Sequence, residues 1–417
     1  MDRRGAGRVH APAGSGAKQR RLDFPAMQAR PESVQLAVHA DPAAVDAAQW
    51  NALLERQPQP TPFMRHEYLR ALHDSGSAVP ATGWTLQLLT LQRDGELLAG
   101  CSAWRKAHSY GEYVFDWAWA EAYRRHGLRY YPKLVVAVPF TPVAGSRLLA
   151  VDERSRRRLL AAVQALAAQS QCSSAHLLFG DDADLATAAA AGWLQRRSVQ
   201  FHWHNRADRP YADFDEFLRG LQRDKRRKIA QERRRVAEAG VTFTVHEGVQ
   251  IDAPLWAFFY RCYANTYAAH GGAPYLSPAF FAGMQRDLSA HWVLFVASVG
   301  GERIAASLIA VDAARGLAWG RYWGCTRQLP CLHFEACYYQ PLAWCIARGF
   351  RRFEGGAQGE HKLARGLLPA ATASAHWLAH PAFADAVARY LAHEDAGIDA
   401  YVDELREHSP FRAPAAG

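Results

Sequence analysis

The sequence lacks any uninterrupted apolar run near the roughly 20 residues that a membrane-spanning helix requires, although 49% of its 417 residues are hydrophobic. It also lacks C-x-x-C pairs, the G-x-S-x-G of hydrolases, the P-loop and a G-x-G-x-x-G in a dinucleotide-binding context. These absences argue against stable membrane insertion and against hydrolase, NTPase and dinucleotide-dependent activities. Neither a metal site nor a bound cofactor is predicted, because the His, Cys, Asp and Glu residues show no regular ligand spacing.

Cysteine is scarce, and its seven residues form no recognisable framework. They stand at positions 101, 172, 262, 325, 331, 337 and 345. An odd number without disulfide or zinc spacing predicts reduced, mostly buried thiols in a cytoplasmic protein. A redox or nucleophilic role for one of them is the alternative.

Positive charge is concentrated at the N-terminus. Residues 1–26 carry six Arg or Lys against two Asp, which accounts for +4 of the net charge of +9. With almost no large apolar residues, residues 1–34 are predicted to form a disordered basic tail, and Met27 is an alternative start. The remainder stays moderately basic, which suits a phosphate-bearing or anionic substrate.

The element pattern predicts two related α/β units. Residues 84–104 and 292–312 each read as two strands joined by a glycine-containing turn. Each hairpin lies near the start of one half and is followed by an aromatic segment. We therefore expect two domains, 35–205 and 206–417, each with a mixed, mostly antiparallel sheet flanked by helices.

The glycine-rich segment 355–359 is the strongest functional signal. A helix over 332–348 and a strand over 350–354 are predicted to precede it, and glycine lets the backbone turn sharply and approach a ligand closely. The ionisable residues that follow are Glu360, His361, Lys362 and Arg365. A strand that runs into such a turn is typical of α/β active sites. A plain loop with solvated charges is the alternative.

A strongly basic segment occupies residues 221–236, within a helix predicted over 215–239. It contains eight basic and two acidic residues. Because such a helix repels itself, a phosphate of RNA, a nucleotide or a lipid is a suitable partner. Arg226, Arg227 and Lys228 are the candidate phosphate contacts. A solvated helix face is the alternative, and no aromatic residues interleave with the charges as they do in single-strand binders.

Two further groups are candidate substrate contacts. Residues 110–123 are dense in aromatic rings around Glu112, and Lys133 follows closely. This composition suits a groove for a sugar- or peptide-bearing ligand, or alternatively a core. His333 and Glu335 open the helix before the glycine segment, where they are candidates for proton transfer or substrate anchoring. Satisfied structural hydrogen bonds are the alternative for this pair.

Together these segments resemble the FemAB-like branch of the GNAT-type acyltransferase superfamily. The resemblance extends over about residues 40–412. Its motifs are His108–Trp117, Tyr130–Lys133, Pro139–Val143, Gly320–Trp323, Leu332–Glu335, Cys337–Gln340, Gly356–Lys362 and His376–Trp377. It implies two tandem GNAT-like domains and transfer of an acyl group onto an amine. In better-known relatives the donor is aminoacyl-tRNA and the acceptor is a peptidoglycan precursor.

The resemblance also implies roles for two segments. The relatives carry a basic helix ending in Gly-Val, which residues 223–241 match, and a lysine implicated in stabilising the transfer, which Lys362 matches. Two departures stand out in this sequence. No long coiled-coil arm follows the basic helix, which weakens the tRNA analogy. Pro341 interrupts the later helix, and Ala343 stands near a position where relatives carry an acidic residue.

We therefore expect a cytoplasmic N-acyltransferase in which an amine attacks an activated carbonyl without a covalent enzyme intermediate. Acyl-CoA or aminoacyl-tRNA is the expected co-substrate, with tRNA as a candidate partner, and a small molecule or cell-wall precursor is the acceptor. Glu335 or His361, beside Glu360, would accept the proton, and Lys362 with the amides of residues 356–359 would stabilise the oxyanion. The expected substrate-binding residues are Arg226, Arg227, Lys228, Gly356, Gln358, Gly359, Arg321, Tyr322, Trp323, His333, Arg365, Glu112 and Lys133.

A non-catalytic module that binds a glycan, a lipid or RNA through the aromatic groove and the basic helix is the alternative function. Glu360 and His361 beside Lys362 favour the enzyme, because binding alone needs no acid/base pair. The sequence does not indicate an oligomeric state.

Overall fold

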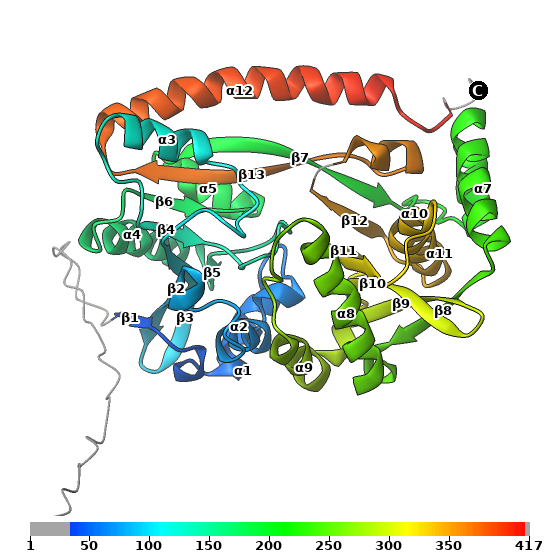
Figure 1. Ribbon diagram of the computed structural model, residues 1–417. Coiled ribbons are helices and arrows are strands. Elements are labelled where there is room, and N and C mark those ends of the chain that lie inside the picture. Colours follow the sequence, from blue (N-terminus) through cyan, green and yellow to red (C-terminus); the bar gives the residue numbers. More distant parts are fainter. Residues whose placement is uncertain (1–33, 358, 413–417) are drawn as a thin grey trace, which may run out of the picture.

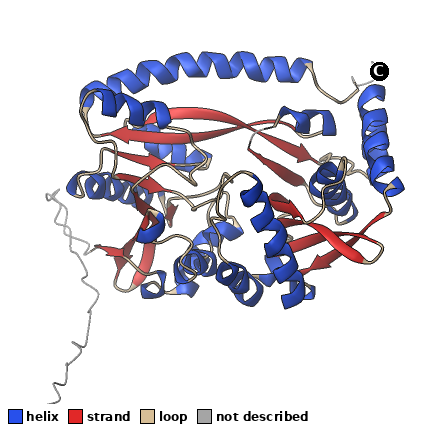
Figure 2. Cartoon of the chain, viewed as in Figure 1, coloured by secondary structure: helices blue, strands red, loops and turns tan. Residues whose placement is uncertain are grey.

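The computed structural model describes residues 34–357 and 359–412, and the strands in them form one mixed sheet (Figure 1). Helices flank this sheet on both faces (Figure 2). The predicted basic tail lies outside the described residues except for Val34, and so do Met27 and Gln358. Within the described residues, no helix combines the length and the hydrophobicity needed to cross a bilayer.

The strands, in chain order, are β1 (Gln35–His39), β2 (Trp84–Arg93), β3 (Glu96–Lys106), β4 (Lys133–Val136), β5 (Leu149–Ala150), β6 (Ser174–Leu177), β7 (Leu194–His204), β8 (Val241–Glu247), β9 (Trp292–Val299), β10 (Glu302–Asp312), β11 (Leu317–Cys325), β12 (Arg352–Ala357) and β13 (Leu368–Leu378). The α-helices are α1 (Ala47–Glu55), α2 (His66–Asp74), α3 (Trp117–Arg125), α4 (Glu153–Gln169), α5 (Asp182–Ala190), α6 (Phe214–Gly220), α7 (Arg223–Glu238), α8 (Ala253–Ala269), α9 (Pro278–Asp287), α10 (Leu332–Phe334), α11 (Gln340–Ala347) and α12 (Pro381–Glu407).

The strand order shows the duplication that the two hairpins predicted. It runs β1-β2-β3-β4-β6 in the first half and β8-β9-β10-β11-β12 in the second. In both halves the neighbouring strands are antiparallel up to the last pair, β4–β6 or β11–β12, which is parallel. The predicted α/β class, with two related and mostly antiparallel sheets flanked by helices, is confirmed.

The two halves exchange their last strands. β7 comes from the first half but pairs with β12 of the second, and β13, the last strand of the chain, pairs with β6 of the first. β7 and β13 also pair with each other, which joins the halves into one sheet. Helix α12 lies along both strands (Figure 1), and an ion pair of 2.8 Å joins its Glu394 to Arg196 on β7. The boundary expected at residue 206 therefore divides the chain but not the sheet, and it remains a prediction.

Two apolar cores lie on opposite faces of the second half of the sheet. Trp319 on β11 packs in the core that includes α2, α8 and α9, whereas Phe353 on β12 packs in the core that includes α6 and α11. We name these the Trp319 face and the Phe353 face. Glu354 is the register partner of Trp319, so its side chain lies on the Trp319 face.

The basic segment differs from its prediction, because the single helix expected over 215–239 is broken. α6 ends at Gly220 and α7 begins at Arg223. Between them, the buried Leu221 is extended and forms a bridge with Phe411, and Gln222 N–H donates to the carbonyl of Pro410 at 2.8 Å. The C-terminal segment thus supplies the partners that interrupt the helix.

The helix expected over 332–348 exists but contains a π-helical turn at Glu335–Tyr339. Pro341 lies two residues beyond Tyr339, and because proline has no N–H and crowds the preceding turn, the wider π turn accommodates it. The strand expected to end at Glu354 continues as β12 through both glycines to Ala357. The left-handed residue that redirects the chain is Gly359, with φ of 93°.

Candidate active site

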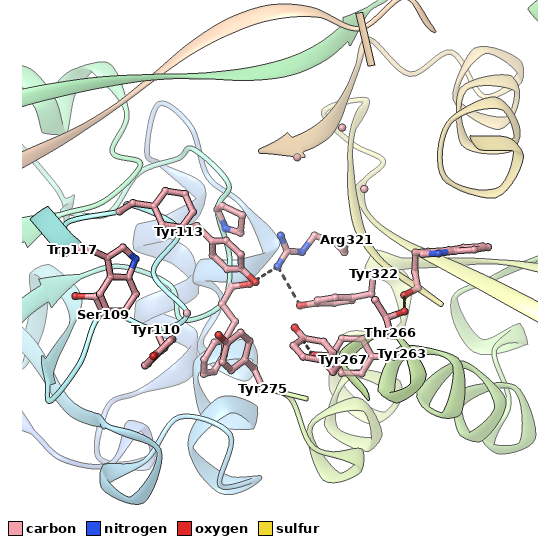
Figure 3. A pocket seen from close by; sticks show the side chains of 18 residues that line it. Ser109, Tyr110, Tyr113, Trp117, Tyr263, Thr266, Tyr267, Tyr275, Arg321 and Tyr322 are labelled. Atoms are coloured by element: carbon pink, nitrogen blue, oxygen red, sulfur yellow. Dashed lines mark hydrogen bonds between the residues drawn. The ribbon is translucent and has the colours of Figure 1, made fainter. Parts of the chain in front are cut away.

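A cavity of about 480 Å³ lies between the two halves of the molecule. Its walls come from the segment 109–117 of the first half, from α8 and from β11 and β12 (Figure 3). The lining residues are Ser109, Tyr110, Gly111, Tyr113, Phe115, Trp117, Phe140, Pro142, Tyr263, Thr266, Tyr267, Tyr275, Gly320, Arg321, Tyr322, Trp323, Gly355 and Gly356. Among the described residues that line it, none carries a carboxylate or an imidazole.

The floor of the cavity is the place where β11 and β12 separate. The two parallel strands pair only over Leu317–Trp319 and Arg352–Glu354, and the cavity residues on both strands follow at once. On the other side, the register of β12 with β7 shifts between Glu354 and Ala357. Gly355 and Gly356 therefore lie outside both regular ladders, where their backbone groups are suited to bind a ligand.

Arg321 reaches the cavity because it is the extra residue of a β-bulge in β11. The partner of Leu308 is Tyr322 and that of Ile309 is Gly320, so Arg321 has no opposite residue. Its Nη2 donates to the carbonyl of Phe140 at 2.9 Å and to the hydroxyl of Tyr322 at 3.2 Å. Its Nε is buried and has no hydrogen-bond partner among the described residues.

Tyrosines form much of the cavity wall. The Tyr263 hydroxyl donates to that of Tyr267 at 3.4 Å, and Tyr275 stacks on Phe140 with ring centroids 4.8 Å apart. Burial raises the pKa of Tyr113, Tyr263 and Tyr267 above the usual value. These phenols consequently stay neutral at physiological pH and serve as hydrogen-bond donors.

Glu112 and Lys133 lie behind the cavity wall rather than in it. Both are buried, and Lys133 Nζ donates to Ser109 Oγ at 2.8 Å, to Glu112 Oε2 at 2.7 Å and to Asp116. Burial raises the pKa of Glu112 to about 7, against the opposing effect of Lys133. The structure thus places this pair where it holds the segment 109–117 in position, and direct substrate binding by either residue remains a prediction.

Lys362 lies against the same two glycines from the Phe353 face. Its Nζ donates to the carbonyl of Gly356 at 3.0 Å, and a Cβ placed on Gly355 would approach Lys362 Cδ at 3.4 Å. The side chain is only 4% exposed. Burial lowers its pKa to about 8, with a smaller opposing effect from Cys337. At neutral pH Lys362 is therefore a buried cation one strand away from the cavity.

His333 and His361 gather near Lys362. The rings of His333 and Trp323 are 5.4 Å apart, and His361 Nε2 is 3.1 Å from the Tyr338 hydroxyl. Burial lowers the pKa of His333 to about 4 and also lowers the pKa of His361. Both imidazoles are therefore predominantly neutral at pH 7.

Arg365 holds the 3₁₀ turn Glu360–Arg365 against α7. Its Nη2 lies 2.8 and 2.9 Å from the two carboxylate oxygens of Glu232, and its guanidinium stacks 3.5 Å from the Phe334 ring. Because both residues of the pair are buried, Arg365 is matched to an internal partner. Substrate binding by Arg365 remains a prediction.

The two predicted carboxylates do not line the cavity. Glu335 accepts from Gln340 Nε2 at 2.7 Å and from Arg233 Nε at 3.2 Å, and it faces a separate groove of about 560 Å³ beside α7. Glu360 is exposed and accepts from the Tyr401 hydroxyl at 3.0 Å. The structure thus brings Lys362, His361, His333 and Trp323 together but leaves these carboxylates apart from the cavity.

The predicted phosphate contacts lie on α7, at the edge of the molecule in Figure 1. Arg227 and Lys228 are exposed, and the half-buried Arg226 donates to the carbonyl of Leu221 at 3.5 Å. α7 contacts the 3₁₀ turn that carries Lys362. The basic helix and Lys362 therefore lie on one side of the sheet, and the tyrosine-walled cavity lies on the other.

Glu354 is a candidate that the sequence did not single out. It is 2% exposed, and burial raises its pKa to about 7, although Arg352 lies 3.1 Å away. A carboxylate at the end of the expected strand, next to two glycines, was the available signal. The cavity tyrosines on α8 gave only a weak signal in the sequence, because their spacing resembles that of an ordinary core helix.

The comparisons with known proteins agree with the motifs. The FemAB-like family model, described as peptidoglycan biosynthesis/recognition, matches residues 41–413. The solved structure of FemX is 11% identical, with a TM-score of 0.51 over 80% of this chain and 96% of FemX. That of L-PGS from Bacillus licheniformis is 12% identical, with a TM-score of 0.50 over 83% of this chain and 97% of that one. No curated protein matches the sequence.

At these identities the structural likeness shows the fold alone. The family model spans most of the chain, including the segments that build the cavity and the glycine-rich strand. The chain therefore belongs to the FemAB-like family, as its motifs predicted.

Proposed function

We propose that the protein is an N-acyltransferase that moves an acyl or aminoacyl group from an activated donor to an amine bound in the tyrosine-walled cavity. The observation that carries this proposal is the separation of β11 and β12 at the cavity floor, with Lys362 directly behind the two glycines. A carbonyl carbon at this opening would meet backbone groups from two strands and a buried cation.

The chemistry needs charge stabilisation more than a covalent intermediate. Attack of the amine on the carbonyl carbon creates an oxyanion, which then collapses and expels the donor's oxygen or sulfur leaving group. Lys362, together with amides near Gly355 and Gly356, would stabilise that oxyanion. Loss of one such donor typically costs roughly 3–4 kcal/mol of transition-state stabilisation.

His361 is the better placed of the two predicted proton acceptors. It lies on the Lys362 side of the sheet, and its lowered pKa keeps the imidazole able to accept a proton at pH 7. Glu335 instead faces the groove beside α7, where it is bound by Arg233. We propose that His361 accepts the amine proton where the amine meets the donor carbonyl, at the opening between β11 and β12, because no described lining residue carries a carboxylate or an imidazole.

The two substrates would approach from opposite faces. The acceptor occupies the cavity, and the phosphate-bearing donor, aminoacyl-tRNA or acyl-CoA, approaches along Arg226, Arg227 and Lys228 to reach Lys362. The family description favours a cell-wall precursor as the acceptor.

Lys362→Met and Lys362→Arg test the proposal as a matched pair. Transfer from acetyl-CoA and from aminoacyl-tRNA to cell-wall precursor amines would be followed by mass spectrometry. We expect Lys362→Met to lower kcat at least a hundredfold and Lys362→Arg to retain part of the wild-type kcat. Circular dichroism should show that both variants are folded. Wild-type turnover in Lys362→Met would remove Lys362 from the mechanism. Ligand binding without transfer from either donor would instead support the non-catalytic module.

A further inference from the structure

Arg321 is the one cationic side chain among the described residues that line the cavity. Its hydrogen-bond partners are the Phe140 carbonyl and the hydroxyls of Thr141 and Tyr322, and none is a carboxylate. These partners orient the guanidinium without forming an ion pair with it, and the charge of the buried Glu354 acts on Arg321 without a hydrogen bond between them. A buried or half-buried charge without a partner is costly unless a ligand supplies the opposite charge.

The position of Arg321 is built by the fold. The β-bulge turns its side chain towards the cavity, and Figure 3 shows the guanidinium between side chains of the two halves. The guanidinium also stacks 5.0 Å from the rings of Phe63 and Tyr322. Its Nε is buried and has no partner among the described residues, and the hydrogen bonds to Phe140, Thr141 and Tyr322 all come from Nη2. A fork fixed in this way is suited to a carboxylate or phosphate.

The remaining cavity surface favours a flat ring. Tyr113, Tyr267 and Tyr275 present ring surfaces and neutral hydroxyls, and Trp117 and Phe140 add further aromatic faces. Planar rings and the apolar faces of sugars pack well against such walls. A volume of about 480 Å³ accommodates one ring with its substituents.

We infer that the cavity recognises a ring-bearing anion, in which a carboxylate or phosphate pairs with Arg321 while a planar or sugar ring packs against the tyrosines. The identification of this ligand as the acyl acceptor rests on the proposed function. Its negative charge and its ring are inferred from the cavity residues alone. A wholly cationic ligand is disfavoured, because Arg321 is the one charged side chain among the described lining residues and would repel it.

The inference is tested by binding three small probes to the full-length protein, followed by intrinsic fluorescence with calorimetric confirmation. Benzoate and phenyl phosphate each combine a ring with an anion, and benzamide is the neutral counterpart. We expect at least one of the two anions to bind at least tenfold more tightly than benzamide, and the better of them identifies carboxylate or phosphate as the preferred group. Equal binding of all three probes would overturn the inference.

Arg321→Gln should abolish the preference for the anions while leaving benzamide binding unchanged. Arg315→Gln, which removes an ion-paired arginine outside the cavity, is the matched control and should preserve the preference. If Arg321→Gln keeps the preference for the anions, another residue must cause that preference, and the inference is overturned.

If Arg321→Gln fails to fold, salt dependence of the wild type decides the question. Anion binding should weaken between 50 and 500 mM NaCl while benzamide binding should not, and a salt-independent anion preference would count against the inference. Because these assays measure binding alone, an anion preference without any acyl transfer would refute the proposed function and leave this inference standing.

Discussion

Lys362 donates a hydrogen bond to the carbonyl of Gly356 at 3.0 Å, and Gly356 also lines the cavity on the opposite side of the strand. The cation is therefore positioned by the backbone of the residue that contacts the ligand space. This arrangement links the two faces of the sheet through a single strand. The protonation state of Lys362 can therefore be tested through the rate of transfer.

The rate of transfer should depend on the protonation of Lys362. Burial lowers its pKa from 10.5 to about 8, so the ammonium form predominates below pH 8 and is lost above it. We expect kcat/KM to fall roughly tenfold per pH unit above about 8. In Lys362→Arg the guanidinium stays charged, and the decline should disappear. A wild-type kcat/KM that instead rises through pH 8 would indicate that Lys362 acts as a base.

Glu354 should make stability depend on pH. Its pKa rises from 4.5 to about 7 in the folded protein, so between these values the folded state holds a proton that the unfolded state releases. Stability therefore falls as the pH rises through this window, by up to roughly 3 kcal/mol. Glu354→Gln should remove that loss and unfold at a higher temperature than the wild type at pH 8. The exposed Glu238→Gln is the control, and equal Tm changes in the two variants would contradict the prediction.

Lys133 should be essential for stability through its buried ion pairs. Lys133→Met leaves the carboxylates of Glu112 and Asp116 buried without their partner, which typically costs roughly 3–5 kcal/mol. Urea unfolding would measure the loss. The triple variant that adds Glu112→Gln and Asp116→Asn should recover only part of it, because neither buried carboxylate remains but Lys106 loses its ion pair with Glu112. A single variant as stable as wild type would show that the cluster is not a structural anchor.

The basic helix should act on the donor alone. Arg226→Ala/Arg227→Ala is expected to raise the KM for the phosphate-bearing donor about tenfold or more, since each lost hydrogen bond to a charged group is worth about 1.5–3 kcal/mol. The KM for the acceptor should not change. Arg124→Ala/Arg125→Ala removes a comparable pair on α3 and serves as the control. An unchanged donor KM would indicate that the exposed cations of α7 only form a solvated helix face and do not bind the donor.

Local patterns in the sequence predicted the regular elements well. The hairpins β2–β3 and β9–β10 were recognised because alternating apolar residues flank glycine turns, and the duplicated order followed from them. The break at Leu221 was missed because its cause, the segment around Phe411, lies far away in the sequence. Helix α12 was also missed, since few of its residues are buried and ion pairs to β7 help to hold it.

The candidate site could be predicted only in part. Lys362 and the glycines were found because they are adjacent in the chain, and their proximity in space follows from that. The cavity joins segment 109–117 to α8 and β11, and no local pattern encodes such an assembly. Arg321 was predicted as a substrate contact, but its orientation depends on a one-residue bulge whose position is set by β10, and this could be seen only in the folded sheet.

The exchange of β7 and β13 has a consequence for how the molecule comes into being. In a fragment that stops after β7, β6 lacks its partner β13. In a fragment that begins with α6, β12 lacks its partner β7. Each would expose an open sheet margin prone to self-association. The sheet of the first half is therefore complete only after the C-terminal strand β13 has been synthesised.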